Sequence, residues 1–136
     1  MLGELVYEGK GKITGQRVLD SEAQIIEITI LGKGKFKDIE VTEMWTYITE
    51  PKPNNLVFCT GKCILSTNDG SIVATASGHG IGPFKNSGKM RYPGSVYFDT
   101  DINSQLAFLN NLVGVNEYEL EESGNYVHKI WEWKYE

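Results

Sequence analysis

The residues of this sequence best suited to chemistry are three glutamates that interrupt strongly apolar segments: Glu27, Glu117 and Glu132. An ionised carboxylate in such surroundings costs free energy unless it is paired or solvated. Arg17 and Arg91 are the expected partners, because a guanidinium can hold a carboxylate through two hydrogen bonds. If these side chains point inward, they could orient a carboxylate or carbonyl group of a ligand. If they point outward, they form surface ion pairs of little energetic value.

The two histidines could transfer protons near neutral pH. His79 lies between Gly78 and Gly80, so its side chain could be unusually accessible. A ligand-binding or acid–base role is one hypothesis, and an outward side chain that hydrogen-bonds a neighbour is the other. His128 shares a strand face with Tyr126, which favours a structural histidine. Neither lies near a serine or cysteine in a recognisable nucleophile motif.

The two cysteines, Cys59 and Cys63, lie four residues apart in "VFCTGKCIL". On a strand this spacing puts them about 13 Å apart on one face. A disulfide spans at most about 7 Å between Cα atoms, so we expect two free thiols. Zinc ligands usually come as two close pairs, and the sequence has no second pair. We therefore expect neither a metal site nor a cofactor.

Length and charge limit the classes of function. The chain has 136 residues, which fits one domain over residues 1–136. Its net charge of −5 works against binding to nucleic acids or anionic membranes. The start "MLGELVYEGKG" has no basic residues followed by an apolar run, so we expect no secretory signal there, and no apolar stretch approaches a membrane-spanning length. We expect a soluble, cytoplasmic protein.

The elements that must position these residues are strands. In "QIIEITIL", Ile26, Ile28 and Ile30 share one face and Glu27 falls on the other, as in a half-buried strand. "NDG" at 68–70 and "SGN" at 123–125 are typical of hairpin turns. About eight or nine antiparallel strands are predicted, the others at 3–9, 10–20, 37–48, 55–67, 71–82, 91–99, 113–122 and 125–135.

The stretch "GHGIGPFKNSG" at 78–88 is the most glycine-rich part of the chain. A dinucleotide-binding loop would need a long helix after it, whereas another strand follows here. Gly78, Gly80 and Gly82 fall on one strand face, where missing side chains let the backbone coil sharply or another element approach. This pattern favours the closure of a small barrel.

One segment, "DTDINSQLAFLNNLVG", breaks the alternation. Leu106, Leu109 and Leu112 recur every three positions, after Asp101 and Ser104, which could cap a helix. We expect a helix of two or three turns that covers an opening or packs beside the sheet. The fold class predicted is an all-β antiparallel barrel with one short helix, with a sandwich as the alternative.

Several stretches resemble a known family: "GKGKITGQRVL", "STNDGSIVATASGHGIG", "RYPGSVYFDT", "LAFLNNLVGVNEYELEESGN" and "IWEWK". Together they resemble small bacterial and archaeal domains of unknown function grouped with the allene-oxide-cyclase-like barrels. The resemblance implies an eight-stranded antiparallel barrel with a cavity inside. The plant cyclase closes a fatty-acid epoxide in its barrel without a cofactor, but none of its functional residues can be transferred to positions of this chain.

Three hypotheses for function follow. The first is a barrel that binds a small, mostly apolar ligand in its interior, oriented by charged groups. The second is a cofactor-independent isomerase or cyclase. The third is a structural protein that forms a homo-oligomer. The candidate ligand-binding residues are Arg17, Glu27, His79, Arg91, Glu117 and Glu132.

Overall fold

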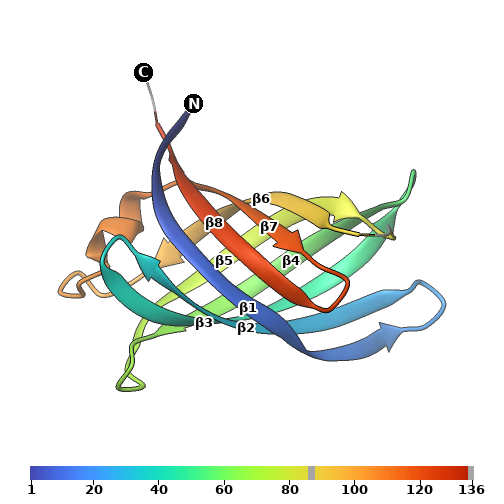
Figure 1. The fold of residues 1–136 in the computed structure, drawn as a ribbon, viewed down its shortest axis with the longest axis horizontal. Coiled ribbons are helices and arrows are strands. Elements are labelled where there is room, and N and C mark those ends of the chain that lie inside the picture. Colours follow the sequence, from blue (N-terminus) through green and yellow to red (C-terminus); the bar gives the residue numbers. More distant parts are fainter. Residues whose placement is uncertain (86–87, 135–136) are drawn as a thin grey trace.

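A computed structural model describes residues 1–85 and 88–134. Eight antiparallel strands form one closed barrel, in which each strand pairs with the next and the last pairs with the first (Figure 1). The prediction of an all-β, eight-stranded antiparallel barrel is confirmed. The strands are β1 (Leu2–Asp20), β2 (Ile25–Phe36), β3 (Ile39–Lys52), β4 (Leu56–Ser66), β5 (Ile72–Pro83), β6 (Met90–Asp99), β7 (Gly114–Leu120) and β8 (Asn125–Trp133).

The first strand is longer than the alternation predicts. Segments 3–9 and 10–20 form the single strand β1, which pairs with β8 from Leu2 to Lys12 and with β2 from Tyr7 to Asp20. Register shifts between Ile13 and Gly15, and between Val18 and Asp20, interrupt its ladder with β2. Such irregularities bend a strand without ending it, so the prediction of two separate strands was wrong.

The predicted helix is shorter than expected. It is a 3₁₀ helix, η1 (Ala107–Asn111), in the connection between β6 and β7. Backbone bonds from Leu109 N–H to the Leu106 carbonyl and from Leu112 N–H to the Leu109 carbonyl have the i to i+3 pattern. Leucines spaced by three fit the three residues per turn of a 3₁₀ helix, which rarely extends further. All three leucines are buried in the core.

Glycines let aromatic rings lie flat against the inner wall. Trp45 and Tyr47 of β3 are stacked, with ring centroids 5.1 Å apart and planes 9° apart. A Cβ atom at Gly61 of β4 would collide with the Tyr47 ring, and one at Gly78 of β5 would lie 3.4 Å from the Trp45 ring. The predicted close approach to the β5 glycines is confirmed at Gly82, where a Cβ atom would collide with the Tyr92 ring.

The two glycine-rich pieces of β1 and β2 pair with each other, glycine against glycine: Gly9 with Gly34, and Gly11 with Gly32. The hydroxyl end of Tyr126 lies where side chains on Gly11 and Gly32 would project. The hydroxyl end of Tyr7 occupies the same position over Gly9 and Gly34. These four positions lack side chains because two tyrosines fill the space.

The two ends of the barrel interior differ. Near η1 the interior is filled by a core cluster to which Phe36, Leu65, Phe98 and Leu109 belong.

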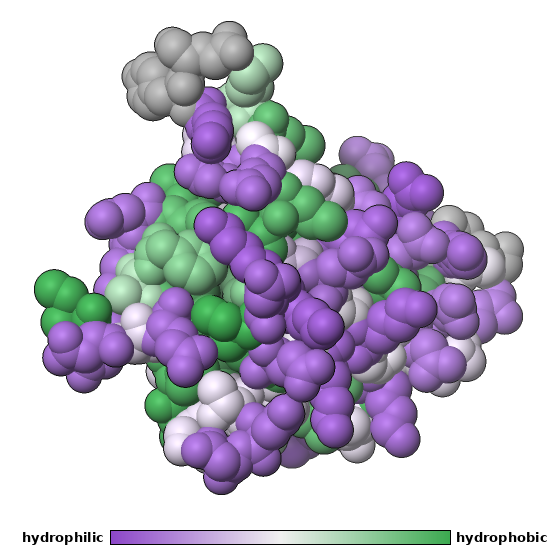
Figure 2. All heavy atoms as spheres, turned by 60° about the vertical axis from the view of Figure 1, so that its left-hand side comes forward, coloured by the Kyte–Doolittle hydropathy of each residue, from purple (hydrophilic) through white to green (hydrophobic). Residues whose placement is uncertain are grey.

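On the outside, hydrophilic side chains cover most of the face in Figure 2, and apolar residues form separate patches between them. Within the described part of the chain, no helix is long and apolar enough to cross a membrane.

Candidate functional site

A cavity occupies the half of the barrel away from η1. Its volume is about 190 Å³, and its wall includes residues near the β1–β2, β5–β6 and β7–β8 turns. The wall is mostly apolar. It is formed by Ile13, Ile26, Ile28, Ile30, Tyr47, Thr49, Val57, Cys59, Gly78, His79, Gly80, Phe84, Tyr92, Gly94, Asn116, Tyr118, Leu120 and Tyr126.

The alternation in β2 builds one side of this wall. Ile26, Ile28 and Ile30 all line the cavity, as the shared face predicted from the sequence requires. Glu27 lies between them in the chain and therefore on the outer face. The same parity in β7 turns Asn116 and Tyr118 inward.

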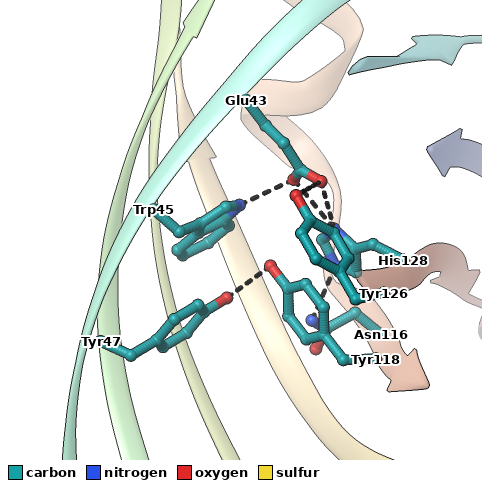
Figure 3. Close-up of polar contacts among 7 residues, drawn as sticks. All are labelled: Glu43, Trp45, Tyr47, Asn116, Tyr118, Tyr126 and His128. Atoms are coloured by element: carbon teal, nitrogen blue, oxygen red, sulfur yellow. Dashed lines mark hydrogen bonds and ion pairs between the residues drawn. The ribbon is translucent and has the colours of Figure 1, made fainter. Parts of the chain in front are cut away.

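A buried polar network lies beside the inner end of the cavity, centred on the carboxylate of Glu43 in β3 (Figure 3). Glu43 is 1% exposed and accepts three kinds of hydrogen bond. The indole Nε1 of Trp45 donates at 2.8 Å, and the hydroxyl of Tyr126 donates at 3.1 Å. The Nδ1 of His128 lies 2.9 Å from Oε1 and 3.2 Å from Oε2. The carboxylate thus joins β3 to β8 across the barrel interior.

Asn116 of β7 extends the network toward the cavity. Its amide Nδ2 donates to Nε2 of His128 at 2.9 Å. On the other side of the ring Nδ1 faces the Glu43 carboxylate, which can only accept, so the Nδ1–H group donates to it. Tyr118 stacks on the His128 ring, with centroids 3.9 Å apart and planes 10° apart. The histidine is therefore held at both nitrogens and on one face.

The network sets the ionisation of its carboxyl group. Burial alone would raise the pKa of Glu43, but the facing His128 and the hydrogen bonds from His128, Trp45 and Tyr126 outweigh burial and lower it. Glu43 is therefore a buried carboxylate that its donors keep ionised.

The tyrosines around the network are neutral phenols. The hydroxyl of Tyr47 donates to that of Tyr118 at 2.6 Å. Burial raises the pKa of both well above the ordinary value, and the nearby Glu43 raises it further. Burial and the nearby Glu43 also raise the pKa of Tyr126. Removing a proton from any of them would add a second charge to the low-dielectric interior.

The predicted glutamate–arginine partners meet on the outside of the barrel. Arg17 and Glu27 lie opposite each other in the β1–β2 ladder, with Nη2 3.4 Å from Oε2. Their side chains are 69% and 26% exposed, so this is a surface ion pair of small energetic value. Arg91 pairs instead with Glu119, at 3.7 Å.

The other predicted site residues also lie apart from the cavity interior. Glu117 follows Asn116, so its side chain is on the outer face of β7. Glu132 lies opposite Gly114, toward the η1 end of β8. His79 borders the cavity only where its backbone passes between two glycines; its side chain is exposed and stacks on Phe58, with centroids 5.7 Å apart. The structure does not bring the six candidates together, and their role in ligand binding stays a prediction.

The cysteines are free thiols, as expected. Cys59 lines the cavity and Cys63 is buried deeper on the same face of β4. Burial raises the pKa of Cys59 to about 11 and that of Cys63 further. Over residues 1–85 and 88–134, no group of three or more histidine, cysteine, aspartate or glutamate side chains is arranged to hold a metal ion.

Sequence reasoning missed Glu43 and Asn116, although each carried a signal. Glu43 shares a strand face with Val41 and Trp45, so it is a charge on the apolar face of β3. Asn116 shares a strand face with Gly114 and Tyr118 in "GVNEYEL". Glu27, by contrast, has apolar strand neighbours, but its own face is the outer one.

The chain resembles two solved structures of unknown function. A protein from Clostridium acetobutylicum matches with a TM-score of 0.78 at 12% identity, over 95% of this chain and 96% of that one. A conserved protein from Rhodopseudomonas palustris matches with a TM-score of 0.75 at 17% identity, over 97% of each chain. No protein-family model and no curated protein matches the sequence. The neighbours share the barrel fold, and the resemblance to allene-oxide-cyclase-like barrels is not confirmed by them.

Proposed function

We propose that this protein binds a small, mostly apolar molecule inside its barrel. The observation that supports the proposal is the cavity of about 190 Å³ with its isoleucine and aromatic wall. An apolar cavity of about 150 Å³ is enough to hold benzene. The space here therefore suits one substituted ring or a short chain of similar size.

The ionisation of the interior favours binding over proton-transfer catalysis. A general acid or base works best with a pKa near the operating pH. Glu43 is shifted below its ordinary range, and Tyr47 and Tyr118 are shifted above theirs. Neither Glu43 nor His128 belongs to the cavity wall. The isomerase or cyclase hypothesis therefore has less support than ligand binding.

Calorimetric titration with p-xylene and p-cresol tests the proposal. Ile28→Trp would fill part of the cavity from its wall, whereas Ile64→Trp adds the same ring at an exposed position of β4. We expect Ile28→Trp to weaken binding by at least about tenfold, or roughly 1.4 kcal/mol, and Ile64→Trp to leave it unchanged. Failure of both compounds to bind the wild-type protein, or equal weakening by both substitutions, would contradict the proposal.

Self-association into a homo-oligomer stays a prediction of the sequence. Sedimentation equilibrium at high protein concentration tests it, since a mass of one chain at every concentration would exclude it.

A further inference from the structure

We propose that the cavity is specific for a neutral ligand that carries a hydroxyl group, and that this hydroxyl donates a hydrogen bond to Oδ1 of Asn116. The inference rests on the proposed function and names the chemical class of the ligand. The fold of the described residues leaves the hydrogen bonding of this oxygen incomplete.

Only the nitrogen of the Asn116 carboxamide has a hydrogen-bond partner in the described part of the chain. Its Nδ2 donates to Nε2 of His128, so its oxygen is turned away from the imidazole (Figure 3). Asn116 is 6% exposed, and its Oδ1 has no hydrogen-bond partner among the described residues. Buried carbonyl oxygens are normally hydrogen-bonded, so an unpartnered one in a cavity wall indicates a place for a donor from outside the chain.

The amide is anchored to the network behind it through His128. The carboxylate of Glu43 can only accept, so Nδ1 of His128 must carry a proton to donate to it. The other ring nitrogen, Nε2, lies 2.9 Å from Nδ2 of Asn116. In this arrangement Oδ1 is the amide atom left without a partner among the described residues.

One flank of this oxygen faces a residue without a side chain. Gly94 of β6 lies across from Asn116 in the β6–β7 ladder, and both line the cavity. A Cβ atom at Gly94 would lie 2.9 Å from Oδ1. The glycine therefore leaves this flank of the oxygen free of a neighbouring side chain.

The tyrosine pair favours a hydroxyl over a group that can only donate. Tyr47 and Tyr118 share one hydrogen bond, which uses one of their two hydroxyl protons. Among the described residues, no acceptor takes the second proton. Both tyrosines line the cavity with Asn116. A ligand hydroxyl can donate to Asn116 and accept from this pair, since an O–H group does both.

Carboxylate ligands are disfavoured. Arg17 and Arg91, the cations predicted to orient a ligand, lie on the outer face with side chains 69% exposed. A carboxylate would meet no lysine or arginine in the described cavity wall and would approach the ionised Glu43. An unpaired charge in such a site is costly.

Three ring compounds of nearly equal size test the inference on the wild-type protein: p-cresol, p-xylene and p-tolualdehyde. In a purely apolar cavity p-xylene would bind tightest, because burying a hydroxyl without a partner costs free energy. We expect p-cresol to bind at least as tightly as p-xylene and more tightly than p-tolualdehyde, which only accepts. Tighter binding of p-xylene would overturn the inference. Tighter binding of p-tolualdehyde would also overturn it, because the amide N–H₂ would then face the cavity.

Binding of p-xylene alone would leave the proposed function standing and remove only the hydroxyl specificity, whereas binding of none of the three would remove both. Asn116→Leu keeps the approximate size of the side chain and removes the oxygen. In this variant we expect the order of p-cresol and p-xylene to reverse. If the variant does not fold, the comparison of ligands on the wild-type protein still decides the question.

Discussion

The Nδ1 atom of His128 lies 2.9 Å from the Oε1 atom of Glu43, although 85 residues separate them in the chain. Their side chains are 0% and 1% exposed. Burying an ion or a strong dipole is costly unless its hydrogen bonds are complete, and here the carboxylate has donors from three side chains. This contact joins β3 to β8, and His128 in turn contacts Asn116 in the cavity wall.

Removing the carboxylate should destabilise the barrel strongly. Glu43→Ala leaves Trp45, Tyr126 and His128 without their buried acceptor, so we expect the free energy of unfolding to fall by about 3–5 kcal/mol. Glu43→Gln keeps the shape and one acceptor oxygen, and we expect a loss of about 1–3 kcal/mol. Urea denaturation measures both. Glu40→Gln, on the exposed part of β3, is the control and should change stability by less than about 0.5 kcal/mol.

The lowered pKa of Glu43 makes stability depend on acid pH. In the unfolded chain this carboxyl takes up a proton near its ordinary pKa of about 4.3, whereas in the folded protein it stays ionised to lower pH. Its contribution is therefore complete at neutral pH and is lost as the pH falls below about 4.3 toward the folded pKa. The stability difference between wild type and Glu43→Gln should narrow over this range. A difference that stays constant or widens would show that Glu43 is not the group responsible.

The glycine under the stacked rings should not tolerate a side chain. In Gly61→Ala the new Cβ atom would collide with the Tyr47 ring, and we expect a loss of about 1–3 kcal/mol from overpacking. Gly15→Ala is the matched control, because nothing lies within 4 Å of a Cβ atom there. That change should be neutral or should stabilise the fold by about 0.4–1 kcal/mol. Equal effects of the two changes on the urea midpoint would argue against the packing described for Trp45 and Tyr47.

The thiols should react slowly in the folded protein. With its pKa raised to about 11, Cys59 has little thiolate at pH 7.5. We expect iodoacetamide to modify it on the order of a hundredfold more slowly than in the unfolded chain. Saturating p-cresol should slow Cys59 further, because Cys59 lines the cavity. Mass spectrometry of the modified peptides gives both rates; a native rate equal to the unfolded one would contradict the burial of Cys59.

The alternation of apolar residues was enough to predict the barrel. Period-two patterns such as Ile26, Ile28 and Ile30 identify strands directly, and hairpin signals such as Asp69-Gly70 place the turns between them. The division of β1 into two strands was wrong, because its glycines mark close packing and bends within one strand. The prediction of a longer helix was wrong, because Leu106, Leu109 and Leu112 follow a spacing of three that a short 3₁₀ helix also satisfies.

The site was harder to predict than the fold. Parity shows which residues share a face, but it does not show which face is inside until all eight strands are assembled. Glu27 lies in an apolar strand, yet the isoleucines on either side of it are the residues that face the cavity. Glu43 lies 85 positions from His128, and no local pattern indicates that the two meet.

The most direct measurement is a titration of the isoleucine δ-methyl NMR signals with p-cresol. Ile13, Ile26, Ile28 and Ile30 line the cavity, whereas Ile64, Ile72 and Ile102 are exposed elsewhere. We expect saturable shifts in the first group and none in the second. Unchanged signals from the four cavity isoleucines, or shifts confined to the exposed ones, would contradict ligand binding inside the barrel.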